Sequence, residues 1–368
     1  MARVVIGLSG GVDSSVAAWL LKQQGHEVIG LFMINWHDTT GTLEGDCPWH
    51  DDRVFAELVA KKLDIALHVV DLSDEYRKRV VEYMFAEYER GRTPNPDVLC
   101  NREIKFDVFL REALKLGADY VATGHYCRKA EVTLPDGRTV YKLLAGSDPN
   151  KDQSYFLALT PISRLKNAVF PLARVRKSEV RAALAEWGLS VPLPRESQEI
   201  CFVPDDDYRA FLKGIGVRLP AGGPMVLLDG HVVGRHGGLW QYTEGQRRGL
   251  GVSWTEPLYV IGKDRSRNAL LLGTADELPV NACAAGELNF LVPPELWPHE
   301  LRVRTRYRQK AVPADIRLVG GGESGMDATA RMLIRFHQPQ LPSAPGQLAA
   351  VFDEHGHVLA GGIICKER

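Results

Sequence analysis

A loop rich in glycine and serine lies near the start of the chain, Ser9-Gly10-Gly11-Val12-Asp13-Ser14-Ser15, between a short apolar run and a stretch with helical spacing. Glycines let the backbone approach an anion closely, and a helix N-terminus presents unpaired N–H groups to it. The serine hydroxyls are further donors, and Asp13 could orient the loop or hold Mg²⁺. A glycine turn with a serine cap is the simpler interpretation, but the complete motif at this position favours phosphate binding. It is not a Walker A sequence, because the G-x-x-x-x-G-K-[ST] pattern is missing.

A cysteine that could act as a nucleophile follows a loop with two prolines, Thr93-Pro94-Asn95-Pro96-Asp97-Val98-Leu99-Cys100-Asn101. The prolines restrict the loop, and a thiolate at Cys100 would be stabilised by a helix N-terminus close by. Asp97 stands three residues earlier, where it could take or give a proton. Cys201, in Glu199-Ile200-Cys201-Phe202, is a second candidate. Either cysteine taken alone is better explained as a small buried apolar residue. Cys127 also lies near a predicted strand end, so position does not select a reacting pair.

Other residues with suitable chemistry stand at the ends of predicted strands. Met33 could pack on an adenine, and Gly124 could let a nucleotide lie against the backbone. A core position for Met33 and a loop position for His125 are the ordinary interpretations. Both residues gain interest because they stand beside the predicted phosphate loop.

A row of basic residues runs through Leu301–Lys310, where every second residue from Arg302 to Lys310 is a cation. If this segment is a strand, the five cations share one face and suit a phosphate backbone. A solvated edge strand, whose charges prevent aggregation, is the alternative. Gln246-Arg247-Arg248 lies in a glycine-flanked turn and could also reach a phosphate.

The elements that must position these residues alternate between strand and helix over the first 125 residues. Strands are predicted at 3–8, 27–34, 66–70 and 119–123, and helices at 14–24, 51–62, 73–89 (capped by Ser73) and 103–116. This rhythm indicates a parallel sheet with helices on both faces. Ligands bind such sheets at the carboxyl ends of the strands, so the loops after Leu8, Met33 and Thr123 are expected to form the site.

The rest of the chain changes character. Residues 128–144 read as a β-hairpin with a Pro135-Asp136-Gly137 turn, and helical patterns return at 152–158, 163–169 and 178–187. Beyond about residue 204, glycine clusters and hairpin turns at Asp229-Gly230 and His355-Gly356 indicate β structure. We predict a Rossmann-like α/β domain (1–203), a small β-rich domain (204–280) and a C-terminal β-barrel (281–368).

Composition bounds the class of protein. The 368 residues carry 45 Lys and Arg against 46 Asp and Glu, a net charge of -1, which argues against a protein that coats nucleic acid by bulk charge. Six cysteines without a secretory signal predict a reducing cytoplasm, and the lack of a C-x-x-C argues against a zinc ribbon. No apolar run reaches the roughly 18 residues of a membrane span.

Several motifs along the chain resemble those of known protein families. The loop SGGVDSS resembles the PP-loop of ATP pyrophosphatases, which implies adenylation of an oxygen. The whole chain resembles the tRNA-specific 2-thiouridylase family, through segments that occur in this order: SGGVDSS, PNPDVLCNREIKF (94–106), GHY (124–126), KDQSYFL (151–157), ESQEICFV (196–203), GQRRGLG (245–251), RTRYRQ (304–309), PGQ (345–347) and GGII (361–364).

The resemblance implies roles for individual residues. Cys100 matches the family's nucleophile, Cys201 its persulfide-bearing cysteine, and Asp97 would be an acid or base. Expected ATP contacts are Gly7, Leu8, Ser9, Gly10, Gly11, Val12, Asp13, Ser14, Met33 and Gly124. Expected tRNA contacts are Asn95, Pro96 and Asp97 at the target base, with His125, Lys151, Asp152, Gln153, Arg306, Tyr307 and Gln347 elsewhere. Because Asp152 would repel a phosphate, a base contact or a structural role suits it better.

The implied reaction replaces the C2 oxygen of the wobble uridine in tRNA with sulfur, using ATP, Mg²⁺ and a sulfur-donor protein. Sulfur could attack as the Cys201 persulfide or as released sulfide, and a disulfide between Cys100 and Cys201 would remain for a reductant. An iron–sulfur cluster on Asp97, Cys100 and Cys201 is possible but not favoured. An adenylating amide synthetase and a non-enzymatic tRNA-binding module are the competing functions. We expect a monomer, with tRNAs for Lys, Glu and Gln as substrates by family resemblance alone.

Overall fold

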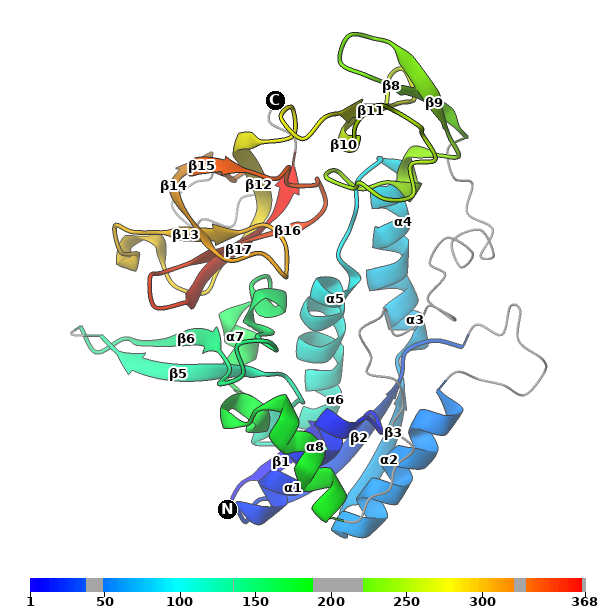
Figure 1. The fold of residues 1–368 in the computed structure, drawn as a ribbon. Helices are drawn as coiled ribbons and strands as arrows, with labels where there is room; N and C mark the ends of the chain where they lie inside the picture. Colours follow the sequence, from blue (N-terminus) through cyan, green and yellow to red (C-terminus); the bar gives the residue numbers. More distant parts are fainter. Residues whose placement is uncertain (38–48, 135, 188–220, 321–328, 366–368) are drawn as a thin grey trace.

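The computed structural model describes residues 1–37, 49–134, 136–187, 221–320 and 329–365. Within these residues the strands form three sheets, which belong to an α/β region, a small β region and a barrel (Figure 1). This arrangement confirms the predicted fold class. The predicted domain boundary at 203/204 lies outside the described residues, and the boundary at 280/281 stays a prediction.

The first sheet is parallel and has the strand order β3–β2–β1–β4–β7. The strands are β1 (Arg3–Gly7), β2 (Glu27–Ile34), β3 (Ala66–Asp71), β4 (Tyr120–Ala122) and β7 (Ala168–Val169). Chain order reverses between β1 and β4, which are neighbours in the sheet. The loops after these two strands therefore diverge and leave a crevice at their carboxyl ends.

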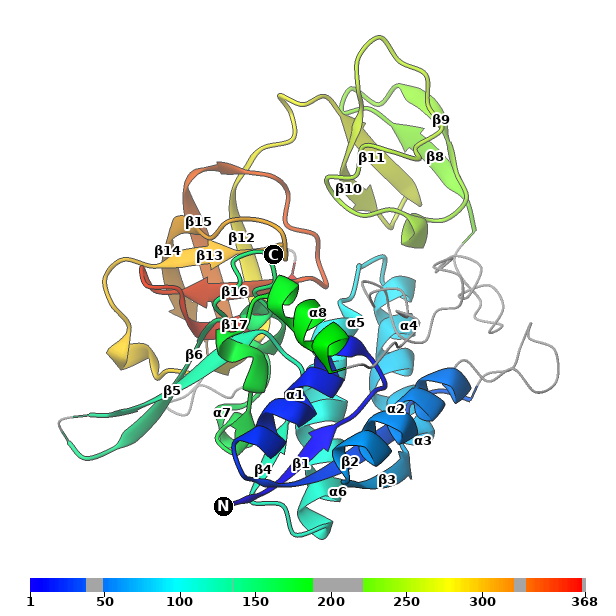
Figure 2. The same ribbon diagram turned by 60° about the horizontal axis from the view of Figure 1, so that its bottom comes forward.

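Helices cover both faces of this sheet because its central strands are apolar on both sides. Val4 and Ile6 of β1 pack with α1 (Val12–Gln23), α2 (His50–Leu63) and α8 (Lys177–Glu186), and Figure 2 shows α8 running close to α1. Val5 points to the opposite face. Two helical segments cover that face: α3 (Ser73–Tyr76), η1 (Arg77–Val81) and α4 (Glu82–Glu89), then α5 (Pro96–Leu99), η2 (Cys100–Val108) and α6 (Phe109–Lys115).

The first of these segments starts where the sequence predicts, but its cap differs. The backbone N–H and the hydroxyl of Ser73 both donate to Oδ1 of Asp71, at 3.0 and 2.7 Å. The prediction that Ser73 caps the helix is therefore wrong. The preceding aspartate accepts these bonds, as short polar side chains commonly do at such positions.

The second segment begins seven residues earlier than predicted, at Pro96 rather than residue 103. Oδ1 of Asn95 accepts a hydrogen bond from the Val98 backbone N–H (3.2 Å), and proline at the first helical position suits a helix start. The chain then continues as a π-helix over η2, a rare form that is frequent at functional sites. Cys100 is thus the first residue of the π-helical part.

The small β region is a sheet in the order β10–β11–β8–β9, formed by β8 (Gly223–Val226), β9 (Val232–His236), β10 (Tyr259–Asp264) and β11 (Ala269–Gly273). The predicted turn between β8 and β9 contains Gly230 at φ +88, a backbone conformation that favours glycine. The side chain of Lys263 reaches the α/β region, where it donates to the Gly91 carbonyl at 2.9 Å.

The third sheet closes into a barrel. Its strands run β12 (Val280–Phe290), β15 (Arg331–Gln340), β14 (Val312–Val319), β13 (Arg302–Arg304), β16 (Leu348–Phe352) and β17 (His357–Cys365), and β17 pairs back onto β12. The predicted hairpin, β5 (Cys127–Thr133) and β6 (Thr139–Ala145), extends this sheet, because His357 of β17 pairs with Leu144 of β6. Short helices η3 (Ser154–Leu157), α7 (Ile162–Leu165) and η4 (Pro171–Arg174) complete the region that joins barrel and α/β sheet.

The predicted basic strand over 301–310 is wrong beyond Arg304, where β13 ends. The backbone N–H and the hydroxyl of Thr305 both donate to Oε1 of Gln309, at 3.3 and 3.0 Å. These local bonds close a turn in place of strand pairing. The cations after Arg304 therefore do not share one strand face.

No helix in the described ranges is both long and apolar enough to cross a membrane.

Candidate functional site

The phosphate loop connects β1 to α1 as the sequence predicts. Gly10 has φ +76, and a Cβ there would lie 2.3 Å from the Asp52 carbonyl oxygen, so only glycine fits. The hydroxyls of Ser14 and Ser15 donate to the Gly11 carbonyl at 3.0 and 2.9 Å. These bonds fix the first turn of α1, whose leading N–H groups have no acceptor within the helix and suit an anion.

The carboxylate of Asp13 has two partners from distant parts of the chain. The Lys177 ammonium lies 2.6 Å from Oδ1, and the Tyr126 hydroxyl donates to the same atom at 2.7 Å. The lysine comes from the first residue of α8, and the tyrosine follows β4. The close approach depends on Gly124, because a Cβ at that residue would lie 3.2 Å from the Asp13 backbone.

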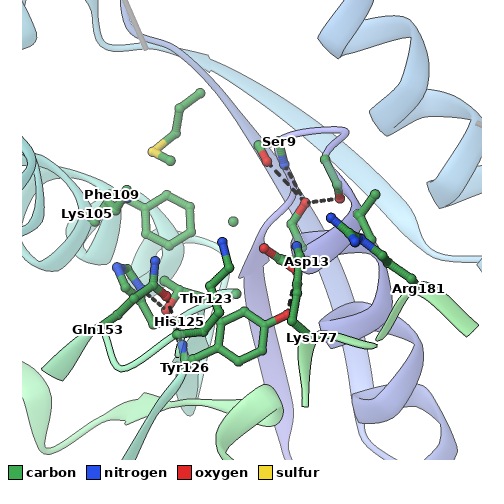
Figure 3. A pocket seen from close by; sticks show the side chains of 17 residues that line it. Ser9, Asp13, Lys105, Phe109, Thr123, His125, Tyr126, Gln153, Lys177 and Arg181 are labelled. Atoms are coloured by element: carbon green, nitrogen blue, oxygen red, sulfur yellow. Dashed lines mark hydrogen bonds and ion pairs between the residues drawn. The ribbon is translucent and has the colours of Figure 1, made fainter. Parts of the chain in front are cut away.

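A cavity of about 470 Å³ opens above the phosphate loop. Figure 3 shows Ser9 and Asp13 on one side of it and Lys105 with Phe109 on the other. Arg181 adds a further cation to the lining. Among the residues predicted to contact ATP, those that line this cavity are Gly7, Ser9, Gly11, Val12, Asp13, Ser14, Met33 and Gly124. Gly10 lies against Asp52 instead, and Leu8 faces the second cavity.

A second cavity, of about 1100 Å³, lies between the α/β sheet and the barrel. The predicted site residues that line it are Leu8, Ser9, Met33, Asn95, Asp97, Cys100, His125, Lys151, Asp152, Gln153 and Tyr307. Arg304, Arg308 and Lys310 line it from the barrel. Cations and aromatic side chains thus surround a space large enough for an extended nucleotide, which suits phosphate contacts and base stacking.

The two cavities adjoin, because six residues line both: Ser9, Met33, Lys105, His125, Lys151 and Gln153. A group bound on the phosphate loop is therefore next to a group bound beside Asp97 and Cys100. Adjoining cavities of this kind suit a group transfer, which requires two reactants side by side.

Asp97 lines the second cavity, and its side chain is accessible from that cavity. The walls of the cavity nevertheless enclose it on its other sides. Desolvation by these surroundings raises the pKa of Asp97 above its ordinary value, and the charge of Lys105 opposes this shift. A carboxyl group with a raised pKa is suited to proton transfer near neutral pH. Cys100, one helical turn further on, is 5% exposed.

His125 is buried at the junction of the cavities. Its Nδ1 lies 2.8 Å from the Thr123 hydroxyl, and burial, assisted by the charge of Lys105, holds the pKa of His125 well below its ordinary value. The ring is therefore neutral at pH 7 and serves as a polar, uncharged wall. Gln153 is held nearby, since its Oε1 accepts from the Tyr126 backbone N–H at 2.9 Å.

Asp152 makes structural contacts, which is one of the two roles expected for it, and the alternative contact with a base stays a prediction. Its Oδ2 accepts from Arg304 at 3.1 Å, and its Oδ1 accepts from the hydroxyl of Ser154 at 2.6 Å. The ion pair joins the α/β region to the barrel. The ring of Tyr307 lies 4.4 Å from that of Phe156, and both rings line the second cavity, where they could stack on a base.

Three residues predicted to contact tRNA line neither cavity. Pro96 is buried in the start of α5. Nη2 of Arg306 donates to the carbonyls of both Glu244 and Pro342, at 2.7 and 2.9 Å, and so joins the small β region to the barrel. Nε2 of Gln347 donates to the carbonyls of Thr93 and Pro94, at 2.8 and 3.2 Å. Arg306 and Gln347 therefore bind other parts of this chain.

Cys127 and Cys201 are the two other cysteines considered for a reacting pair. Cys127 is fully buried, and desolvation, with the Asp152 charge nearby, raises the pKa of the Cys127 thiol well above its ordinary value, which disfavours the nucleophilic thiolate. Cys201 lies outside the described residues, and its predicted pairing with Cys100 stays a prediction. In the described part of the chain, no group of three or more His, Cys, Asp or Glu side chains could hold a metal.

Sequence reasoning missed Lys105, Tyr126, Lys177 and Arg181 as site residues. Lys105 and Tyr126 lie within the quoted motifs, so their neighbours could have suggested them. Lys177 and Arg181 carry no such signal, because they reach the phosphate loop only through the packing of α8 on α1.

Comparison with known proteins gives matches along most of the chain. Family models match at residues 2–205 (tRNA methyl transferase HUP domain), 209–274 (tRNA methyl transferase PRC-barrel domain) and 280–364 (aminomethyltransferase beta-barrel domain). The tRNA-specific 2-thiouridylase MnmA of Lawsonia intracellularis is 49% identical, with 99% of each chain covered. Its counterpart from Oleidesulfovibrio alaskensis is 47% identical, again with 99% of each chain covered.

Among solved structures, the U34-tRNA thiolase NcsA from Methanococcus maripaludis is 18% identical, with a TM-score of 0.34 over 54% of this chain and 62% of that one. A similarity at this level carries no argument about activity.

Proposed function

The chain belongs to the family of tRNA-specific 2-thiouridylases, ATP-using enzymes that modify tRNA, and we propose that it replaces the C2 oxygen of the wobble uridine with sulfur after adenylating that oxygen. The observation that carries this proposal is the pair of adjoining cavities. One contains the phosphate loop, the other contains Asp97 and Cys100, and six residues line both.

The family models are described as methyl transferase domains, so methyl transfer is the second activity to consider. Methyl transfer from a sulfonium donor makes no use of a loop that binds ATP phosphates, whereas adenylation requires one. The phosphate loop beside Cys100 and the names of the full-length relatives favour ATP-dependent thiolation.

In the first proposed step, the uracil O2 attacks the α-phosphorus of ATP. The bond from the α-phosphorus to the bridging oxygen breaks and pyrophosphate leaves, while the uracil N3 proton passes to a base, for which Asp97 is positioned. The loop N–H groups and the cations Lys177 and Arg181 hold the phosphates. Mg²⁺ would neutralise phosphate charge, and Asp13 is the carboxylate of this cavity that suits it.

In the second step, sulfur from a persulfide on Cys201 replaces the adenylyl group at C2, and AMP leaves. Two routes balance. The Cys100 thiolate can attack the inner sulfur of the persulfide, releasing hydrosulfide that attacks C2. Alternatively, the terminal persulfide sulfur attacks C2 first and forms the S–C bond, and Cys100 then attacks the Cys201 sulfur and breaks the original S–S bond of the persulfide. Both routes end with thiouridine and a Cys100–Cys201 disulfide, which a thiol reductant restores.

The substrate side of the proposal rests on the second cavity. Arg308 and Lys310 can contact phosphates there, and the Phe156–Tyr307 pair can stack on an unpaired anticodon base. A sulfur-donor protein, a monomeric state and a cytoplasmic location complete the proposal.

The test measures pyrophosphate release and 2-thiouridine formation separately, with tRNA, ATP and a persulfide donor. We expect Cys100→Ser and Cys201→Ser to keep pyrophosphate release and to lose thiolation. Cys365→Ser, in β17, is the control and should keep both activities. Thiolation at the native rate by Cys201→Ser would overturn the persulfide assignment. Pyrophosphate release that needs an amine and no tRNA would favour an amide synthetase.

A further inference from the structure

Two lysines, Lys105 and Lys151, line both cavities, and Lys105 belongs to the helical segment formed by α5, η2 and α6. Lys105 lines both the cavity above the phosphate loop and the cavity beside Asp97 and Cys100. Figure 3 shows it with Phe109, across the pocket from Ser9 and Asp13. A side chain at this junction is placed where groups bound in the two cavities would meet.

The helical segment that carries Lys105 explains its position. Asp97, Asn101, Lys105 and Phe109 follow one another at four-residue intervals along α5, η2 and α6, and residues at this spacing share a helix face. Asp97 and Asn101 line the second cavity, Phe109 lines the first, and Lys105 lines both. The segment is therefore a common wall, with its positive charge at the boundary.

Among the described residues, Lys105 has no anionic partner at ion-pair distance, although the Asp97 carboxyl lies near enough to interact with its charge. Within the described ranges, its ammonium makes no hydrogen bond and no ion pair within 4 Å, whereas Lys177 is paired with Asp13. Its field acts on both sides of the wall, since it lowers the pKa of His125 and opposes the raised pKa of Asp97. A half-buried cation that has no close ionic partner in the described part of the chain is poised to stabilise an anion.

We propose that Lys105 is a catalytic residue of the adenylation step, and that its ammonium contacts the non-bridging oxygens of the α-phosphate as the uracil O2 attacks. This inference rests on the proposed function. The O2–phosphorus bond forms, the bond to pyrophosphate breaks, and the N3 proton goes to the base. Lys105 stays protonated throughout and stabilises the negative charge that gathers on the α-phosphoryl oxygens in the transition state. Lys177 and Arg181, nearer the loop, retain the leaving pyrophosphate.

The test uses the full-length protein with saturating ATP and tRNA and follows pyrophosphate release. Lys105→Met should slow release by about a hundredfold or more, the range found for single donors to a developing anion. Dissociation constants for a non-hydrolysable ATP analogue and for tRNA should change less than about threefold, because the contact strengthens only in the transition state. Lys105→Arg, which keeps the charge, should retain a larger share of the rate than Lys105→Met.

The matched control is Lys115→Met, in the same helical segment with a side chain 70% exposed, which should behave as native protein. A Lys105→Met rate within threefold of native overturns the inference, and so does a loss confined to ATP or tRNA affinity. If Lys105→Met does not fold, Lys105→Arg decides alone: a loss of about a hundredfold in that variant, with native-like binding of ATP analogue and tRNA, would overturn the inference. Failure of the proposed function is distinct, since native protein would then release no pyrophosphate with tRNA.

Discussion

The ammonium of Lys177 lies 2.6 Å from Oδ1 of Asp13, so an ion pair joins the phosphate loop to the first turn of a helix 164 residues later. The lysine side chain is only 13% exposed, and the pair faces the first cavity. In the absence of this cation, the Asp13 carboxylate would repel the phosphates that the loop is built to hold. Lys177 of α8 thus neutralises the negative charge of Asp13 in a loop that suits an anion. Nothing in the sequence near either residue indicates this pairing.

We predict that Lys177→Met weakens ATP binding more than it affects any later step. The variant loses a cation at the phosphates and leaves Asp13 uncompensated, so the KM for ATP in pyrophosphate release should rise at least about tenfold. tRNA affinity should stay at the native value. Lys61→Met, an exposed lysine of α2, is the control. An unchanged KM for ATP would contradict a phosphate-binding role for Lys177.

Asp97→Asn should stabilise the protein at neutral pH while it abolishes thiolation. The folded-state pKa of Asp97 is raised, because desolvation outweighs the attraction of Lys105. A carboxyl group with a raised pKa loses its contribution to stability as pH rises through that folded pKa, so the native protein carries the cost at pH 7 and not below about pH 3.8. The gain in the midpoint of thermal unfolding should therefore be present at pH 7 and vanish near pH 3.

Asp276→Asn provides the comparison for that experiment, because Asp276 is exposed in the small β region. Its substitution should leave the midpoint of thermal unfolding at pH 7 close to the native value. A variant Asp97→Asn that is less stable than native protein at pH 7 would show that the Asp97 carboxylate is favourably solvated in the second cavity.

Sequence patterns predicted those parts of the fold that depend on neighbours along the chain. The strand at 27–34 and the loop from Ser9 to Ser15 follow from apolar runs and glycine positions, and both are found where expected. The turn after Arg304 was missed because bonds between Thr305 and Gln309 outweigh the alternation of charges. The approach of Lys177 to Asp13 was missed because it arises from helix packing across the sheet. Likewise, nothing local shows that β6 pairs with β17.

The predicted tRNA contact at Gln347 stays a prediction, and the structure shows which contacts this side chain makes within the chain. Gln347 donates to the carbonyls of Thr93 and Pro94, and the Thr93 backbone N–H donates to the Pro345 carbonyl at 2.8 Å. Between them, Gly346 has φ +94, and a Cβ there would lie 2.9 Å from the Thr93 carbonyl oxygen. The turn of the barrel is therefore clamped onto the chain that leads into Asn95 and Asp97.

We predict that Gln347→Ala lowers kcat for thiolation and leaves the KM for tRNA nearly unchanged. Loss of the two hydrogen bonds frees the loop that positions Asp97, and it should also cost about 1–3 kcal/mol of stability. Gln338→Ala, on the exposed face of β15, should change neither quantity.

Gly346→Ala should reproduce the loss of kcat, because its Cβ would push Thr93 away. Gly356 also has a positive φ (+80), but no atom lies within 4 Å of a Cβ added there. Gly356→Ala therefore introduces backbone strain without displacing a neighbour, and it should keep the native kcat. A Gln347→Ala variant with native kcat and a raised KM would instead establish the direct contact with tRNA.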